Sequence, residues 1–550
     1  MGPRFPASSC NGKIVSAKFF SAGAEAAATL NSTVDFLSPF DAVGHGSHVA
    51  STTAGNAGVP VVVNGYYYGE ASGMAPRARI AVYKAVYPTV GTFNRCGFVV
   101  QAAGNQGPGS SSIVSYSPWA VAFASPGTDR NYPSSILCGN GTEIEGVGLS
   151  GPTFGYGLLL HKLVLARDAV KADGTFPRTQ PYVEECQYPE ALDHNVVQGS
   201  IVICTFSAGF YNGTSSLTAI INTAKGLGFM GFILVANPAY GDFIAEPIPF
   251  VAAKAAIGEG RVASFMGQAP VVSRFSSRGP DFTNTSRNPF DVLKPDILAP
   301  GHQIWAAWSP VSASEPALTG YNFAPQSGTS MATPHVAGIG ALIKQYNPSW
   351  IPSMIASAIS TTSTKYDKNG ELIMAEGSGI GSTYPSSHFD LGAGFVGPSR
   401  AMDPGLVLPS GYEDYISFLC SLPEIKSPAT TRNATGQLRN YTLDHPANLN
   451  LPSITISALR GSQIIRRIFN NVGSKPETYV CSAVSPNGTI VDLCPTWFRI
   501  APQGIQELHV QAKVTQAMDD FTFGEIVLTG SLNHIVLMSL SVFPVSISKS

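Results

Sequence analysis

Three short segments of the chain combine a reactive or hydrogen-bonding side chain with glycine and other small residues. The first, Gly44–Ala50, contains His45. The second, Gln101–Gly107, contains Asn105. The third, Ser327–Gly338, contains Ser330. We expect each segment to lie at the end of a strand or the start of a helix. A serine, a histidine and an amide in such places are the groups that a nucleophilic hydrolase needs.

Ser330 has the surroundings of a nucleophile. Small neighbours let a ligand approach the backbone closely, and the backbone N–H of a serine at a helix start faces developing negative charge. A serine hydroxyl is a weak nucleophile, so it needs a hydrogen-bonded base, and His45 at a glycine-flanked helix start is the candidate. The amide of Asn105, directly after a predicted buried strand, is the candidate for a second oxyanion donor.

Each of these residues has a plainer interpretation when it is taken alone. A serine at a helix start usually caps the helix, a single histidine is usually structural, and Ala-Gly-Asn is an ordinary turn. His45 and His48 also have a His-x-x-His spacing, but the absence of a glutamate between them and of an evident third ligand makes a zinc hydrolase a weak alternative. The joint occurrence of the three segments, in this order, favours the serine site.

The composition indicates a globular protein with several domains. The chain has 550 residues, of which 44% are hydrophobic and only 12% are charged, and its formal net charge is −2. This charge gives no reason to expect binding to nucleic acid or to an anionic membrane.

The longest apolar run, near residues 226–236, is far shorter than the roughly 20 residues that span a bilayer. We find no apolar stretch of a signal peptide at the N-terminus.

Two parts of the chain have the pattern of an α/β domain. In residues 1–137, continuously apolar runs such as Arg79–Val86 and Gly97–Ala103 predict buried strands of a parallel sheet. The same texture returns in residues 254–435, where apolar residues at helical spacing predict a helix from Thr329 to about Tyr346. We expect these two parts to form one domain.

The other two parts are predicted to be β-rich. Residues 138–253 contain short strand-like runs between turn residues, which is typical of a separate inserted domain. Residues 436–550 contain short strands with turn signals and almost no helical pattern, which predicts a terminal β-sandwich.

The chain resembles the subtilisin-like serine proteases and, among them, the plant-type subtilases. Four further stretches resemble signatures of that family, namely Phe275–Pro280, Leu293–Gly301, Asp403–Val407 and Asp414–Cys420. The resemblance implies a subtilisin-like α/β core formed by 1–137 and 254–435, a protease-associated (PA) domain at 138–253, and a fibronectin type-III-like domain at 436–550. It also implies an extracellular endopeptidase that cleaves polypeptide substrates and needs no metal or organic cofactor.

The resemblance further implies roles for individual residues. His45 is the general base, Ser330 is the nucleophile, and Asn105 forms the oxyanion hole together with the backbone N–H of Ser330. His48 and His335 lie in the same motifs but have no role in the family, so we expect them to be packing or surface residues.

The chain departs from the family at the third member of the catalytic triad. That member is an aspartate followed by serine or threonine and then glycine, upstream of the histidine. Only Asp35 and Asp41 precede His45, and neither is followed by this motif. We expect Asp41 to contact a helix start and the orienting carboxylate to be missing, which impairs catalysis. The alternative is a binding or regulatory homologue with an inert core.

A second departure concerns the connection between two predicted strands. Parallel neighbours need a crossover of about a dozen residues or more, but only the ten residues Tyr87 to Cys96 separate Val86 from Gly97. We therefore expect one βα unit to be missing. In the family this unit includes the strand that pairs with the substrate backbone.

The cysteines and the glycosylation motifs are compatible with a secreted protein. Eight cysteines are scattered without a Cys-x-x-Cys motif or a metal-ligand cluster. Cys186 and Cys204, and likewise Cys481 and Cys494, are close enough in sequence to be candidate disulfides. Seven Asn-x-Ser/Thr acceptor motifs occur, against about four or five expected by chance.

Overall fold

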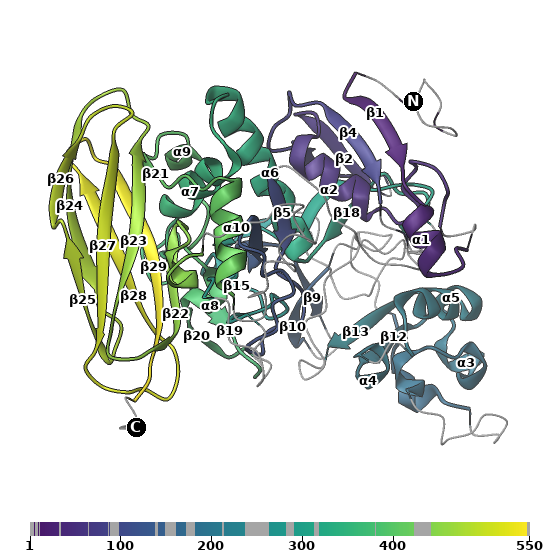
Figure 1. The fold of residues 1–550 in the computed structure, drawn as a ribbon. Helices are drawn as coiled ribbons and strands as arrows, with labels where there is room; N and C mark the ends of the chain where they lie inside the picture. Colours follow the sequence, from purple (N-terminus) through teal and green to yellow (C-terminus); the bar gives the residue numbers. More distant parts are fainter. Residues whose placement is uncertain are drawn as a thin grey trace.

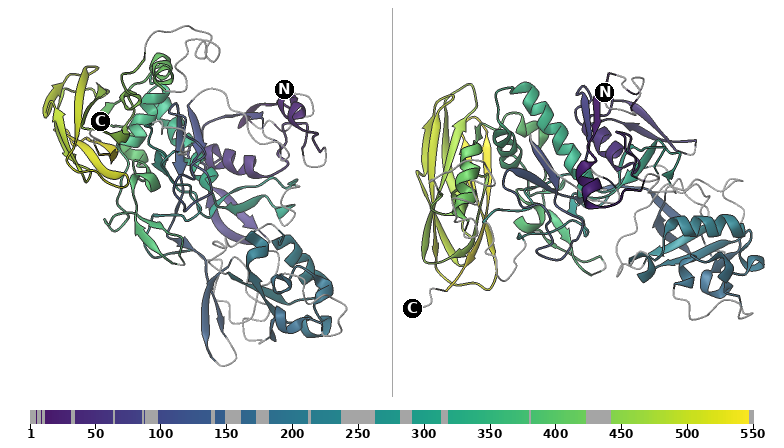
Figure 2. Two further views of the ribbon diagram at one scale, coloured as in Figure 1. Left: turned by 60° about the horizontal axis from the view of Figure 1, so that its bottom comes forward. Right: turned by 45° about the vertical axis from the view of Figure 1, so that its right-hand side comes forward.

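The structure is a computed structural model, and it describes residues 5, 9, 12–31, 35–63, 65–85, 87, 98–137, 141–148, 161–171, 182–211, 214–236, 263–281, 291–312, 318–379, 381–422 and 442–546. An α/β core lies in the middle of the molecule (Figure 1). The C-terminal β-sandwich and the inserted segment lie on opposite sides of this core in all three views (Figures 1 and 2).

Five parallel strands of the core form two separate sheets, and a third, mixed sheet contains a further short parallel pair of β15 (Val271–Val272) with β19 (Met374–Glu376). Strand β1 (Ile14–Phe19) pairs with β4 (Ile80–Lys84), while β16 (Ile297–Leu298), β6 (Ala120–Ala124) and β5 (Val99–Ala102) form a second sheet in that order. The apolar runs therefore form parallel strands, as predicted, but the prediction that they are buried was wrong for β4, whose residues alternate between half-buried and exposed. Within the described residues, β4 does not pair with β5. The short connection between them lies outside the described residues, apart from Tyr87.

Two helices of the core pack against each other, and one of them packs against the second sheet. They are α2 (His45–Ala54) and α6 (Thr329–Tyr346), and α6 also contacts β5 and β6. The predicted bounds of α6 are confirmed, and its residues Val336 and Ile339 are buried. A Cβ at Gly338 would lie 2.8 Å from the carbonyl oxygen of Thr53, so glycine is required where the two helices touch.

The remaining helices and strands of the core surround these two helices and the sheets. Two antiparallel pairs are formed by β2 (Val59–Val63) with β3 (Tyr66–Ala71) and by β17 (Ile304–Ala307) with β18 (Phe323–Gln326). The other elements are α1 (Ala22–Ala27), β19 (Met374–Glu376), β20 (Thr383–Pro385), α7 (Pro352–Thr361), α8 (His388–Leu391), α9 (Pro398–Ala401) and α10 (Tyr412–Ser421), while β21 (Leu406–Val407) joins a sheet of the C-terminal sandwich.

Short antiparallel pairs join the two ends of the inserted segment. Strand β7 (Pro126–Gly127) pairs with β15 (Val271–Val272), and β8 (Arg130–Asn131) pairs with β14 (Ser264–Phe265). The chain therefore leaves the core after residue 131 and returns before residue 264. The predicted bounds, 138 and 253, both lie outside the described residues.

The inserted segment contains more helix than the sequence analysis predicted. Its parallel sheet has the order β11 (Leu163–Leu165), β12 (Ile201–Phe206) and β13 (Gly231–Ala236), and β9 (Pro133–Leu137) forms a hairpin with β10 (Glu143–Val147). The helices are α3 (His194–Val197), α4 (Ala208–Tyr211) and α5 (Leu217–Leu227). The side chain of Ser216 caps α5 by accepting from Ala219 N, and Gly228 ends it in the left-handed conformation. These two residues are the signals in the sequence that mark the ends of α5.

One of the two candidate disulfides is present. Cys186 and Cys204 are bonded inside the inserted segment, whereas Cys481 is buried and Cys494 is exposed, both as free thiols. The pairing of Cys481 with Cys494 was therefore wrong. These two residues lie on strands of different sheets, since Cys481 is in β24 and Cys494 is in β25.

The C-terminal part is a β-sandwich, as predicted. Its strands are β22 (Ser453–Leu459), β23 (Ser462–Asn471), β24 (Glu477–Val484), β25 (Thr489–Cys494), β26 (Trp497–Ile500), β27 (Ile505–Val514), β28 (Thr522–Gly530) and β29 (Ile535–Pro544). One sheet has the order β21-β23-β27-β25 and the other β22-β29-β28-β24-β26. Alternate residues of these strands, such as Ile465, Leu508 and Leu528, fill the space between the sheets. The predicted start at residue 436 lies outside the described residues.

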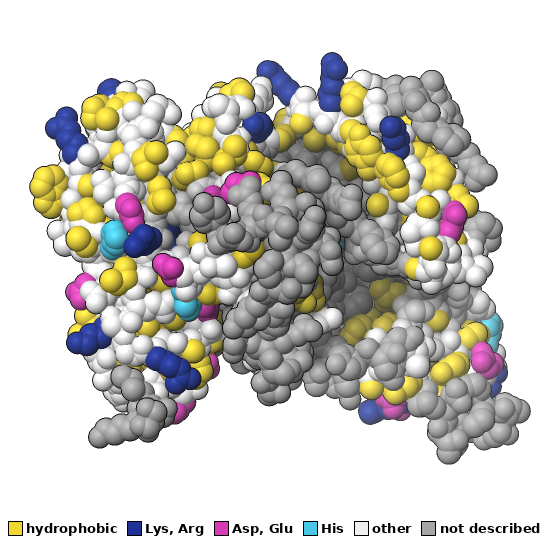
Figure 3. Space-filling model, viewed as in Figure 1, with side chains coloured by type: hydrophobic (Ala, Val, Ile, Leu, Met, Phe, Trp, Pro, Cys, Tyr) yellow, Lys and Arg dark blue, Asp and Glu magenta, His cyan; other side chains and the backbone are white. Residues whose placement is uncertain are grey.

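The surface agrees with the low charge content. In Figure 3 the charged side chains on the visible face are scattered and form no extended patch of one sign. None of the described helices is long and apolar enough to cross a bilayer.

Candidate active site

Asn105 lies at the N-terminus of α6, directly beside the serine segment. Its side-chain oxygen accepts hydrogen bonds from the backbone N–H and from the hydroxyl of Thr329, each 2.9 Å long. The same hydroxyl accepts from the backbone N–H of Gly104 at 3.2 Å. A Cβ at Gly328 would lie 3.2 Å from Nδ2 of Asn105, so the donor end of the amide faces the backbone next to Ser330. The structure thus places Asn105 against the two residues that precede Ser330.

His45 is the first residue of α2, and a glycine makes room for this helix start. Gly44 has φ of +100°, and a Cβ there would lie within 2.2 Å of the indole ring of Trp308. A residue with a side chain would clash with Trp308 and would be strained in this conformation. His45 reaches the surface, yet desolvation lowers its pKa, and the charge of Asp41 opposes this effect.

Contacts along α2 place its first turns beside the chain that leads into Ser330. Nε2 of His48 lies 2.8 Å from the carbonyl oxygen of Ile304, and Ile304 pairs with Gln326. At the other end of α2, Thr53 touches Gly338 of α6. The two helices therefore run in the same direction, with His45 and Ser330 at the same end.

The other histidines of the motifs are tied to the backbone. His48 is fully buried, and desolvation lowers its pKa to about 4. Nδ1 of His335 lies 2.8 Å from the carbonyl oxygen of Met331. These contacts agree with the expected packing role. In the part of the chain that the structure describes, no group of three His, Cys, Asp or Glu side chains is arranged to hold a metal ion.

Both oxygens of the Asp41 carboxylate are used by the start of α2. Oδ1 accepts from the backbone N–H groups of Val43 and Gly44 at 3.0 and 2.9 Å. Oδ2 accepts from the N–H and the hydroxyl of Ser47 at 2.7 and 2.8 Å. Burial raises the pKa of Asp41, but these hydrogen bonds outweigh it and hold the pKa below its usual range. Asp41 is an ionised helix cap.

Asp35 is also engaged away from the histidine. It is fully buried and accepts from the backbone N–H of Asn31 at 2.8 Å. Desolvation lowers the pKa of Lys84, and the charge of Asp35 opposes this effect because it favours the protonated form of Lys84. The ammonium group of Lys84 donates to the carbonyl oxygens of Phe36 and Phe40. Among the described residues, no carboxylate forms a hydrogen bond or ion pair with the ring of His45.

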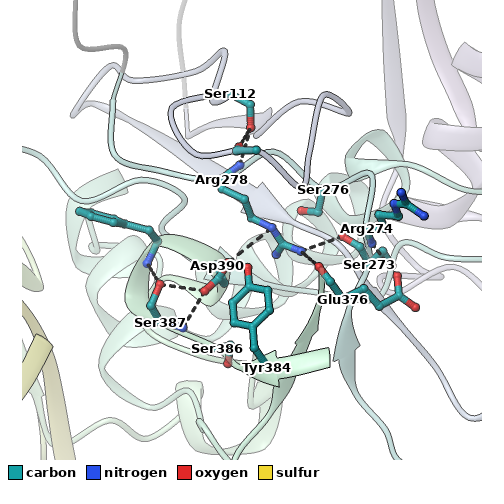
Figure 4. A network of polar contacts seen from close by, with 12 residues as sticks. Ser112, Ser273, Arg274, Ser276, Arg278, Glu376, Tyr384, Ser386, Ser387 and Asp390 are labelled. Carbon is teal, nitrogen blue, oxygen red and sulfur yellow. Dashed lines mark hydrogen bonds and ion pairs between the residues drawn. The ribbon is translucent and has the colours of Figure 1, made fainter. Parts of the chain in front are cut away.

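A buried arginine near Asn105 was not recognised as important in the sequence. Arg278 belongs to the signature stretch Phe275–Pro280, is 2% exposed, and pairs with Asp390 at 3.4 Å (Figure 4). The available signal was an arginine between small residues and a Gly-Pro pair, because an arginine that becomes buried needs a partner. The sequence could not identify that partner more than one hundred residues away.

Comparison with protein families gives two matches. The family model described as "Subtilase family" matches residues 94–381, and that described as "Fibronectin type-III domain" matches residues 448–542. The first match includes Asn105 and Ser330, while His45 precedes it. The second match covers all strands of the sandwich except the last residues of β29 and the short strand β21.

The chain is also similar to curated plant proteins along nearly its whole length. It is 56% identical to Subtilisin-like protease SBT2.4 of Arabidopsis thaliana, with 98% of this chain and 75% of that protein covered. It is 38% identical to Subtilisin-like protease SBT2.5 of the same species, with 97% and 75% covered. The match to SBT2.4 spans 624 residues, which exceeds the 550 residues of this chain by 74. The relative thus has inserted residues within the matched region, which is consistent with a missing βα unit.

Proposed function

The chain belongs to the subtilase family of serine proteases, and we propose that it is an endopeptidase whose His45 base lacks its orienting carboxylate. The observation that carries the proposal is the pair of hydrogen bonds from Thr329 to Asn105, since it fixes an amide donor at the start of the helix that contains Ser330. The substrates are polypeptides, and the proposal includes a secreted location and a PA identity for residues 138–253.

The proposed reaction uses three groups in sequence. Oγ of Ser330 attacks the carbonyl carbon of the scissile peptide bond while His45 accepts the hydroxyl proton. The oxyanion receives hydrogen bonds from the backbone N–H of Ser330 and from Nδ2 of Asn105. His45 then gives its proton to the leaving amine, and water hydrolyses the acyl-enzyme. A lowered pKa keeps His45 neutral near pH 7, which is the state that accepts a proton.

The proposed weakness follows from the role of Asp41. A carboxylate on Nδ1 normally holds the imidazole in the correct tautomer and stabilises its protonated form. Asp41 instead caps α2 with both oxygens. In subtilisin, a member of this family, loss of the aspartate alone lowers kcat by about 3 × 10⁴. We therefore propose a residual activity far below that of a subtilase with a complete triad.

The division of the parallel strands favours a second candidate, a non-catalytic binding or regulatory homologue. Strands β4 and β5, neighbours in chain order, do not pair with each other within the described residues. The substrate-pairing unit of the family is expected to lie in this part of the fold. A protein of this kind would keep its partner binding after Ser330→Ala.

Labelling with a fluorophosphonate probe distinguishes these possibilities. Purified protein is compared with Ser330→Ala and His45→Ala, and adducts are located by mass spectrometry. We expect slow labelling at Ser330 that is absent in Ser330→Ala, together with protein cleavage close to the background of that variant. Labelling as fast as that of an intact subtilase would show that another group replaces the aspartate. The inert homologue would be supported if the wild type formed no probe adduct at Ser330 and cleaved protein no faster than Ser330→Ala.

A further inference from the structure

We infer that the buried ion pair between Arg278 and Asp390 positions the loop containing Asn105 and links this loop to the C-terminal β-sandwich. Residues 104–113 are called the Asn105 loop, and residues 273–279 the Arg278 segment. The role of this loop in catalysis rests on the proposed function, whereas the link rests on contacts alone.

The Asn105 loop is held by the Arg278 segment at both of its ends. Near Asn105, the N–H of Gln106 donates to Oγ of Ser277 at 3.0 Å, and the N–H of Gly107 donates to the carbonyl oxygen of Phe275 at 2.8 Å. Farther along, Ser112 N donates to the carbonyl oxygen of Arg278 at 3.0 Å, and Arg278 N donates to Oγ of Ser112 at 2.9 Å. These bonds fix the loop to one backbone segment.

The two backbones are also too close to admit a side chain between them. A Cβ at Gly107 would lie 2.1 Å from the carbonyl oxygen of Ser276, and a Cβ at Gly104 would lie 2.6 Å from Oγ of Ser277. A displacement of the Arg278 segment must therefore displace the Asn105 loop, because packed groups at these distances cannot move independently.

The side chain of Arg278 anchors this segment inside the core. Nε lies 3.4 Å from Oδ1 of Asp390, and Nη2 donates to the carbonyl oxygens of Ser273 and Glu376 at 3.2 and 3.4 Å (Figure 4). Asp390 also accepts from the hydroxyl of Tyr384 and from the N–H of Ser387, both at 2.7 Å. Removing one member of such a buried pair leaves the other charge uncompensated.

The residues next to Asp390 contact the sandwich. The ring of Phe389 meets Phe521 and Phe523 edge to face, with centroids 5.0 and 5.2 Å apart. Nε2 of His388 lies 2.9 Å from the carbonyl oxygen of Gly524. The backbone oxygen of Phe389 in turn accepts from Gly279 N at 2.9 Å. A continuous series of contacts thus runs from β28, through α8 and Arg278, to the Asn105 loop.

Hydrogen exchange of the Asn105 loop tests the link without any need for activity. Asp390→Asn keeps the shape of the side chain and an oxygen that accepts from Ser387 N at the start of α8, but it removes the charge that faces Arg278. We expect the amides of the Asn105 loop to exchange about tenfold faster or more in this variant, while those of α6, β23 and β27 are unchanged. Phe523→Leu, on the sandwich side, should accelerate the same loop amides by about threefold.

The matched control is Glu525→Gln, two residues from Phe523 on the same strand. It removes the ion pair between Lys365 and Glu525, 2.7 Å long, which also joins core and sandwich but does not touch Arg278. The Asn105 loop should keep its wild-type exchange in this variant. Unchanged loop exchange in Asp390→Asn, or equal acceleration in Glu525→Gln, would overturn the inference.

A double-mutant cycle separates positioning of Asn105 from a general structural role. Fluorophosphonate labelling rates are compared for wild type, Asp390→Asn, Asn105→Ala and the double variant. We expect Asp390→Asn to slow labelling about fivefold or more with Asn105 present and less than about twofold without it. Equal slowing in both backgrounds would contradict a positioning role. If the wild type shows no labelling at Ser330, the proposed function fails, and the exchange measurement alone decides the link.

Discussion

Thr329 donates two hydrogen bonds to the side-chain oxygen of Asn105, one from its backbone N–H and one from its hydroxyl. Thr329 precedes Ser330, so this contact ties the chain after β5 to the start of α6, where the proposed mechanism forms an oxyanion. The amide of Asn105 can present only its NH₂ group to a ligand, because its oxygen is already engaged.

Removal of the Thr329 hydroxyl should loosen this contact. Thr329→Val keeps the shape of the side chain but loses the bonds to Asn105 and Gly104, and it should lower the free energy of unfolding by about 1–3 kcal/mol. Thr333→Val, one turn later in α6, loses only a bond to a carbonyl of its own helix and should cost less than about 0.5 kcal/mol. Urea denaturation measures both, and equal effects would argue against the Asn105 contact.

Asp41 should behave as a helix cap in a pH-dependent way. Asp41→Ala removes four hydrogen bonds at the start of α2 and should cost about 1–2 kcal/mol at pH 7. The folded pKa lies below the ordinary value of 3.8, so the contribution is fully present above about pH 4 and is lost as the pH falls through the folded pKa. Unfolding free energies from pH 7 to pH 3 provide the test. A difference between the proteins that grows in acid would contradict this role.

His534 should make the junction between core and sandwich weaker at alkaline pH. Its Nδ1 lies 2.8 Å from Glu477 and its Nε2 lies 3.3 Å from Asp403 of the core. Burial lowers its pKa, but the hydrogen bonds and charges of these two carboxylates outweigh burial and raise it above 6.5. The stabilisation is therefore fully present below about pH 6.5 and is lost as the pH rises through the raised folded value.

Denaturation of wild type and His534→Gln between pH 5.5 and pH 9 measures this effect. The wild type should lose stability over this range relative to His534→Gln, and Asp403→Asn should show a smaller loss than the wild type. Parallel curves for wild type and His534→Gln would exclude a role of His534 in the pH dependence.

The disulfide should stabilise the inserted segment alone. Cys186 and Cys204 are 18 residues apart, so replacing both by serine should cost about 3 kcal/mol locally. Limited proteolysis should then cut within residues 132–263 faster, while the sandwich stays intact. Cys494→Ser serves as the control, because this thiol is exposed and unpaired. Faster cutting in Cys494→Ser as well would point to a less specific effect.

Much of the fold was predictable, because local sequence patterns determine it. The continuously apolar runs became parallel strands, the helical spacing after Thr329 became α6, and the short strands with turn signals in the C-terminal part became the sandwich. Helix α5 was missed because residues 138–253 were interpreted as short strands between turns, although Ser216 and Gly228 mark the ends of the helix. The pairing of Cys481 with Cys494 failed because closeness in sequence does not bring two side chains together, and here Cys481 lies in the sandwich core while Cys494 is exposed.

The candidate site was predictable only where its groups lie in short motifs. The motifs identified Asn105 and Ser330, and the contact between Asn105 and Thr329 is compatible with their proposed roles. The pairing of Arg278 with Asp390 depends on tertiary packing across 112 positions of the chain, which no local pattern encodes. The separation of β4 from β5 could be suspected from the short connection between them, but the order of the strands in each sheet required the structure.

An NMR titration of the His45 ring tests most directly whether this base lacks a carboxylate partner. His45→Ala assigns the signal, and His48, with its pKa lowered to about 4, titrates separately. The structure predicts a His45 pKa below 6.5, which falls further in Asp41→Ala because the charge of Asp41 raises it. A His45 pKa well above 6.5, with an Nδ1 proton held in a strong hydrogen bond, would show that a carboxylate completes the triad and would contradict the account.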